Sequence, residues 1–431
     1  MTSATGIADH RRVHRLSTLF FLFALIALFG ISYLSSQDFR ENQATNAPKT
    51  RAYFTYKPAR DAEVKALKRQ LNQAGASSIA TVPVWSYDIT SSRDGYSYSG
   101  MIVGSDPRTG GTTTSIQTFI VPLKIITNTV GTNYQSTTNT FSTKPGVTNF
   151  NPSAANEACL GSTNNVPLTL VQQSPLFQST ATFTFGGTDV GATQYIDAFE
   201  RANFYAVDDH DNYHVLLNPV TTLNQVTVNV PKAYGTTMPK PPLSACGHIG
   251  IVDVGWFDDY LTGTLIPSLA SQGVGPTTFP IFLVHDVVWA SPVTNLNTCC
   301  VGGYHSALTT PSSIQTYAAA DFDYTGHFGV AFLDTVVLSH EIAEWANDPF
   351  GNNETPGWRA GDATTGFCQR NLEVGDPLIG TLAPTIAMSN GFSYHLQELA
   401  FFNWFFGKPS NAIYGWFSLN DSFYGDAGPP C

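Results

Sequence analysis

From about residue 80 the chain is built from short β-branched and aromatic runs separated by Gly-rich and Thr-rich turns. Runs of this kind are typical of β-strands. They predict strands in residues 81–87, 96–103, 115–126, 213–230, 279–284 and 314–320. Residues 128–165 show no such pattern and are predicted as loop.

Apolar residues that recur every three or four positions predict the helices. The segments with this spacing are residues 60–74, 192–205, 256–270 and 335–347. Gly75 and Gly273 follow two of them as stop signals. Asp334 is the expected N-cap of the last helix, which Asp348-Pro349 must end. Strands interleaved with helices predict an α+β fold.

The first 36 residues have the pattern of a targeting segment. Basic residues at positions 11, 12 and 15 precede an apolar run from Leu19 to Ile31. That run is shorter than the ~20 residues of a bilayer-spanning helix. A cleaved signal peptide and an uncleaved membrane anchor through residues 18–34 both fit the pattern. Either one predicts a secreted or cell-envelope protein, with membrane association at the N-terminus in the second case.

The rest of the chain divides by its helix-like and strand-like sequence patterns. We expect a linker and short helix in residues 37–79, a β-rich lobe in 80–250 and a second lobe in 251–431. A single domain over residues 80–431 fits the same pattern, because no Pro/Ser linker interrupts it.

Charged residues make up only 12% of the chain, about half of the usual ~25%. Beyond residue 70 there are 27 Asp and Glu against 10 Lys and Arg. An acidic body repels phosphates, so nucleic acid is excluded as a partner. The same acidity suits cations.

Six cysteines lie beyond the targeting segment. An even number in an oxidising compartment predicts up to three disulfides, and the sequence leaves their pairing open. Adjacent Cys299 and Cys300 are expected to bond to different partners, because a disulfide between neighbours is strained.

The predicted helix 335–347 has two unlike faces at about 100° per residue. Its apolar face carries Leu338, Ile342, Trp345 and Ala346, and its polar face carries His340, Glu341, Glu344 and Asp348. No Lys or Arg occurs between Asp321 and Arg359. Carboxylates grouped without a basic partner repel one another, so this face predicts a bound cation.

The spacing also has a chemical meaning. Residues i and i+4 project from one side of a helix, so His340 and Glu344 can reach a single ion. Glu341 stands beside that ion, where a general base takes a proton from water.

This arrangement resembles the H-E-x-x-H helix of the zincin metallopeptidases, with Glu344 in place of the second His. The resemblance implies a zincin-like C-terminal lobe and a zinc ion, although another divalent ion also fits a Glu ligand. It further implies Glu373 as the third ligand, with Asp376 and Asp348 supporting the ligands. His305 is the main rival ligand, followed by His327 and His395.

Four pieces together are similar to exported proteins of the EXORDIUM or phosphate-induced family. They are Gly303-Tyr304-His305, His340 to Pro349, Gly357-Trp358 and Glu373 to Asp376. That resemblance implies an extracellular location and a zincin-like core.

The leading hypothesis is an exported metal-dependent hydrolase, a zinc peptidase that activates water and acts on a peptide or protein substrate. The alternative is a non-catalytic envelope or matrix protein whose acids hold a structural ion or none. Glycan binding through exposed aromatic residues is a third hypothesis. Two other polar groups are interpreted as structural: Asp208 to His214 as a turn, and His285-Asp286 as the polar end of a strand.

Overall fold

The structure is a computed structural model. It describes residues 79–110, 112–128, 133–135, 140–142, 147–155, 165–185, 188–204, 212–238, 247–293, 300–329, 332–359, 368–380, 383–402, 428 and 430–431, together with Ala66 and Phe405. Arg51–Cys431 forms one compact unit. The predicted targeting segment lies outside the described residues, as does all of residues 37–78 except Ala66, which is helical.

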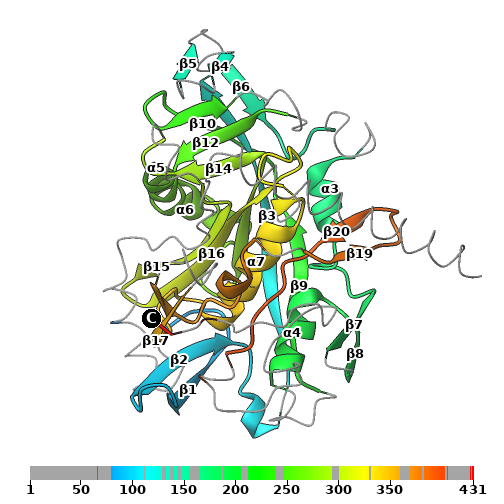
Figure 1. Ribbon diagram of the computed structural model, residues 1–431, viewed down its shortest axis with the longest axis vertical. Coiled ribbons are helices and arrows are strands. Elements are labelled where there is room, and N and C mark those ends of the chain that lie inside the picture. Colours follow the sequence, from blue (N-terminus) through cyan, green and yellow to red (C-terminus); the bar gives the residue numbers. More distant parts are fainter. Residues whose placement is uncertain are drawn as a thin grey trace, which may run out of the picture. The chain divides into compact units, whose positions relative to one another are not determined.

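The largest sheet has seven strands (Figure 1). They are β3 (Thr113–Asn128), β6 (Val147–Phe150), β9 (His214–Thr222), β10 (Val226–Asn229), β13 (Phe279–His285), β15 (Gly303–Thr310) and β16 (Ser313–Phe322). The order is β10-β3-β13-β16-β15, and β6 and β9 also pair with β3. β3 runs parallel to β9, β10 and β13, and β13 runs parallel to β16. β15 pairs antiparallel with β16, which gives the parallel sheet an antiparallel edge.

Alternate side chains of β13 enter two different cores. Ile281 and Leu283 belong to a cluster with Leu338 and Ile342. Phe282 and Val284 belong to a second cluster, with Phe257 and Leu261 among others. All seven residues of β13 are buried. A parallel strand covered on both faces is expected to be such a continuous apolar run.

Helix α7 (Val336–Asn347) covers one face beside β15 and β16, and α4 (Tyr195–Asn203) packs against α7 and β9 (Figure 1). Trp345 of α7 stacks on Phe279 of β13, with ring centroids 3.6 Å apart. Its Nε1 donates a hydrogen bond to Thr316 Oγ1 at 3.0 Å. These contacts attach α7 to the middle of the sheet.

The second core is closed by one broken helical segment. It comprises α5 (Val254–Tyr260), the π-helical turn η3 (Leu261–Leu265), α6 (Ile266–Ser268) and the 3-10 turn η4 (Ala270–Gln272). Gly273, in the left-handed conformation at φ 93°, ends it. Among non-proline residues glycine adopts this conformation with least strain, so the predicted stop is confirmed.

The remaining elements are short. They are β1 (Val84–Thr90), β2 (Ser97–Val103), η1 (Pro107–Thr109), β4 (Asn133–Gln135), β5 (Thr140–Ser142), α3 (Pro167–Gln172), β7 (Ala181–Phe185), β8 (Thr188–Thr193), β11 (Gly235–Met238), β12 (Ile249–Asp253), β14 (Val287–Ala290), β17 (Glu354–Arg359), β18 (Cys368–Asn371), η7 (Asp376–Leu378), β19 (Thr385–Ala387) and β20 (Ser393–His395). Among the described residues, no helix combines the length and apolar character needed to cross a membrane.

The predicted α+β class is confirmed, and so are the six predicted strand segments and the helices predicted after residue 190. Two predictions are wrong. The predicted loop 128–165 contains β4, β5 and β6, because hydrogen bonding between neighbouring segments outweighs a Thr- and Asn-rich composition. The N-cap of α7 is Thr335 and not Asp334. Asp334 adopts φ 43°, and its Oδ1 accepts hydrogen bonds from Thr335 N and His395 N.

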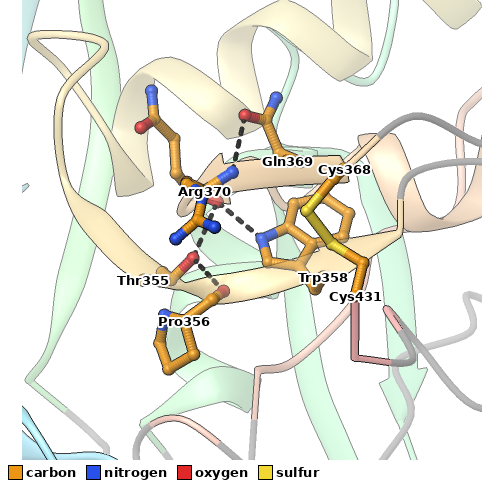
Figure 2. The surroundings of a disulfide bond; sticks show 8 residues. Thr355, Pro356, Trp358, Cys368, Gln369, Arg370 and Cys431 are labelled. Carbon is orange, nitrogen blue, oxygen red and sulfur yellow. Dashed lines mark hydrogen bonds between the residues drawn. A yellow bond between two sulfur atoms is a disulfide. The ribbon is translucent and has the colours of Figure 1, made fainter.

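A disulfide joins Cys368 of β18 to Cys431, beside the buried ring of Trp358 (Figure 2). It attaches the last residue of the chain to the β17–β18 hairpin. Cys300 is also disulfide-bonded, to a partner outside the described residues. Cys159, Cys246 and Cys299 lie outside those residues too, so the remaining pairing stays a prediction.

Candidate metal centre

Helix α7 presents His340, Glu341 and Glu344 to the protein interior. All three side chains have no solvent exposure. The helix has one apolar and one polar face, yet all 12 of its residues are buried. Its polar face is covered by β15 and by the chain that follows β18, and these two segments bring the other polar groups of the site.

His305 comes from the edge strand β15, and Glu373 and Asp376 come from the segment after β18. Glu373 and Asp376 are fully buried, and His305 is 5% exposed. Residues from three distant parts of the chain thus meet against one helix.

Among the residues that the structure describes, two groups of three side chains have ligand atoms within 4.8 Å of one another, and Glu344 belongs to both. In the first group, His340 Nε2 lies 3.0 Å from Glu344 Oε2 and 3.8 Å from Asp376 Oδ1. In the second, His305 Nδ1 lies 3.4 Å from Glu341 Oε2 and 3.9 Å from Glu344 Oε2.

Glu373 belongs to neither group. Its Oε2 lies 3.7 Å from His305 Nε2. The residue predicted as third ligand therefore faces His305, while its predicted supporter, Asp376, lies beside His340. Each carboxylate thus contacts a histidine of the candidate site.

Backbone groups hold Glu344 in place. Its Oε1 accepts hydrogen bonds from the N–H groups of Gly375 at 3.2 Å and Asp376 at 3.1 Å, at the start of η7. One oxygen is therefore used for anchoring, and the other, Oε2, is directed between the two imidazoles.

Gln397 is a site residue that the sequence did not reveal. Its Nε2 donates to Gly375 O at 2.7 Å, and its side chain lies beside His340, where it raises the pKa of that imidazole against the larger effect of burial. Ser339 Oγ accepts from Gln397 N at 2.9 Å and fixes this segment. No spacing rule links Gln397 to α7, so only the fold identifies it.

Two glycines allow the close approach of backbone to α7. A Cβ on Gly375 would lie 2.3 Å from His340 Nδ1, and one on Gly303 would lie 2.7 Å from Glu341 Cγ. Cβ atoms do not occur at these distances, so any larger residue would displace a site side chain. The glycines of the G-Y-H and E-x-G-D pieces are thus required by space.

Asp348 supports the site from the end of α7. Its Oδ1 accepts hydrogen bonds from Asn352 N at 2.8 Å and Asn353 N at 2.9 Å. Its carbonyl oxygen lies 3.1 Å from His305 Nε2. This carboxylate shapes the turn that follows the helix, and its backbone orients His305.

Burial dominates the electrostatics of the site. Desolvation lowers the pKa of His340 to about 4 and that of His305 to about 3, so both imidazoles are neutral near pH 7. Desolvation, and then the charge of neighbouring carboxylates, raises the pKa of Glu341 and Glu344 well above the usual range. Neutral imidazole is the form that binds a metal, and a cation would favour the ionised carboxylates.

The donor set fits a divalent metal ion. Bonds of about 2.0–2.2 Å in tetrahedral geometry place two ligand atoms ~3.4 Å apart. The distances from His340 Nε2 to Glu344 and Asp376 bracket that value. Within the described part of the chain no hydrogen-bond partner reaches Glu341 Oε1, although this atom is buried. Such an orphaned acceptor is costly unless a cation or proton satisfies it.

The other candidates lie elsewhere. His327 Nε2 bonds to Gly247 O, and His395 Nδ1 lies 2.6 Å from Asp334 Oδ2. His285, at the end of β13, is hydrogen-bonded through Nδ1 to the carbonyl oxygen of Phe322. Most of the acidic cluster before His214 lies outside the described residues, and His214 itself pairs with Asp197. Comparison of the chain with protein families, curated proteins and solved structures found no match.

Proposed function

We propose that the protein is an exported metal-dependent hydrolase of zincin type, with peptides or proteins as substrate. The observation that carries this proposal is the buried group of His340, Glu344 and Asp376, whose donor atoms lie within reach of one ion. The spacing on α7 supports a zincin-like arrangement of the C-terminal half. The peptide substrate and the export rest on the resemblance and on the N-terminal pattern.

His340 and Glu344 would hold the ion, and Asp376, whose ligand atom lies within 4.8 Å of theirs, would be the third ligand in place of Glu373. Gln397, whose side chain lies beside the His340 ring, would support this ligand. The backbone N–H groups at the start of η7 would hold Glu344 in one orientation. A bound zinc ion supplies Lewis acidity, polarising a carbonyl group and lowering the pKa of water. In a single-ion hydrolase, Glu341 is the neighbouring group that would accept the proton.

The complete burial of the ligands favours a second candidate, a non-catalytic envelope or matrix protein with a structural ion. Catalytic zinc sites keep one position open to substrate, whereas structural sites are closed. The two candidates share the ion and differ in turnover.

The test is the metal content of the full chain, purified without chelator, beside the His340→Ala/Glu344→Ala double variant. We expect bound divalent metal in the wild type and none in the variant. No metal in either protein, with both folded by circular dichroism, would contradict both candidates. Peptide-library hydrolysis that a chelator abolishes selects the hydrolase. A chelator that lowers the melting temperature of a protein without hydrolytic activity selects the structural site.

A further inference from the structure

His305 and Glu341 lie on the opposite side of Glu344 from Asp376 and form a group of their own. Their ligand atoms and one of Glu344 lie within 4.8 Å of one another, the span across which one ion can be bound. An ion held by His340, Glu344 and Asp376 needs neither of them.

The hydrogen bonds of His305 define which nitrogen carries its proton. Nε2 lies 3.1 Å from the carbonyl oxygen of Asp348 and 3.7 Å from Glu373 Oε2. A carbonyl oxygen can only accept a hydrogen bond, and the same is true of an ionised carboxylate. The proton of His305 therefore belongs on Nε2. Nδ1 then has a lone pair, and a backbone carbonyl behind the ring is the usual support of a metal-binding histidine.

That lone pair is directed at further acceptors. Glu341 Oε2 lies 3.4 Å and Glu344 Oε2 lies 3.9 Å from His305 Nδ1. Three acceptors that converge in a dry interior repel one another unless a cation or a proton lies between them. Glu341 Oε1, the second oxygen of the same carboxylate, has no hydrogen-bond partner among the described residues.

The geometry points to a second divalent-cation site formed by His305, Glu341 and Glu344, which shares Glu344 with the first site. This inference rests on the proposed ion at His340 and extends it to a two-ion centre. Ions in two-metal hydrolytic sites lie about 3.5–4 Å apart, a separation that a bridging carboxylate spans. Mixed imidazole and carboxylate ligands suit transition ions such as zinc or manganese.

The second ion changes the role of Glu341. In the two-ion form Glu341 is a ligand and is not available as proton acceptor. The edge strand β15 acquires a function as well, because it carries His305 to the helix and Gly303 gives Glu341 room beside it.

The test is the zinc or manganese stoichiometry of the full chain by mass spectrometry after dialysis against the metal alone. We expect two ions in the wild type, one each in His305→Ala and Glu341→Gln, and none in Glu344→Ala. Glu341→Gln preserves size and shape, so it keeps the test valid if His305→Ala does not fold. His327→Ala is the matched control, since His327 bonds to Gly247 O, and it should retain two ions.

Electron paramagnetic resonance gives a readout independent of activity. Two adjacent Mn²⁺ ions should give an exchange-coupled spectrum in the wild type and a simple six-line spectrum in Glu341→Gln. One ion in the wild type and also in His305→Ala would overturn the second site and leave the proposed function intact. A wild type that binds no metal would overturn both.

Discussion

Gly375 lies closer to His340 than any other residue type allows. It is an ordinary right-handed residue at φ −83°, so space and not backbone conformation requires glycine. Gly375→Ala should push the imidazole away from Glu344 and weaken metal affinity about 10–100-fold, the loss typical of disturbed ligand support. Isothermal titration with zinc measures it.

The matched control is Gly263→Ala. A Cβ there meets no atom within 4 Å, and the residue lies in an exposed part of η3. Its metal affinity should equal that of the wild type. Equal affinities for Gly375→Ala and Gly263→Ala would refute the steric role of Gly375.

Glu200 predicts a pH dependence of stability. It is buried, accepts a hydrogen bond from Asn347 Nδ2 at 2.7 Å, and has its pKa raised by burial to about 8. The folded state therefore keeps this proton between pH 4.5 and 8, while the unfolded state loses it. The stabilisation is complete below the unfolded pKa and is lost as the pH rises through the folded one.

Glu200→Gln keeps an acceptor for Asn347 and removes the titration. The free energy of unfolding of the wild type should fall more steeply from pH 5 to 8, by at most about 1.4 kcal/mol per pH unit relative to the variant. Urea denaturation at several pH values measures both curves. Parallel curves would show that Glu200 has an ordinary pKa in the folded state.

At the scale of elements, part of the site on α7 could be predicted from the sequence. The grouping of His340, Glu341 and Glu344 was predictable, because helical geometry alone places them on one face. The burial of this face was not predictable. The burial depends on β15 and on the E-x-G-D segment, whose approach is decided by tertiary packing.

The attachment of α7 to the sheet can be measured. Trp345→Ala removes the stack on Phe279 and the hydrogen bond to Thr316, and should lower the free energy of unfolding by about 3–5 kcal/mol. Trp256, which stacks at the partly exposed edge between Tyr234 and Tyr260, is the control. Trp256→Ala should cost less than half as much in chemical denaturation. A larger cost for Trp256→Ala would contradict the central place of Trp345.

Across the whole molecule, the α+β class and most elements followed from local pattern, whereas the order of strands did not. The central sheet pairs β3 with β9, β10, β13 and β6. Such distant pairings depend on which apolar faces meet, and no local rule encodes them. Gln397 was missed for the same reason, since it reaches His340 only after the sheet has formed.

The disulfide links the end of the chain to the site. Gln369, next to Cys368, donates from Nε2 to Asp376 Oδ2 at 3.2 Å. Cys368→Ala/Cys431→Ala opens a bridge between residues 63 positions apart. It should lower the free energy of unfolding by about 4 kcal/mol and weaken metal affinity through the freed Asp376. Thermal denaturation and zinc titration measure the two effects. An unchanged metal affinity in the variant would show that the β17–β18 hairpin does not support the site.

The close contacts of Gly303 and Gly375 also define how related chains can be recognised. A ligand can be exchanged for another donor, but a glycine in close contact with an imidazole or a carboxylate cannot be replaced by a residue with a side chain. A glycine two residues before a histidine, H-E-x-x-E, and E-x-G-D in that order form a fingerprint whose glycines should vary least. A distant chain with both glycines and a His-to-Asp exchange at a ligand would still have room for the same centre, whereas one with alanine at either glycine would not.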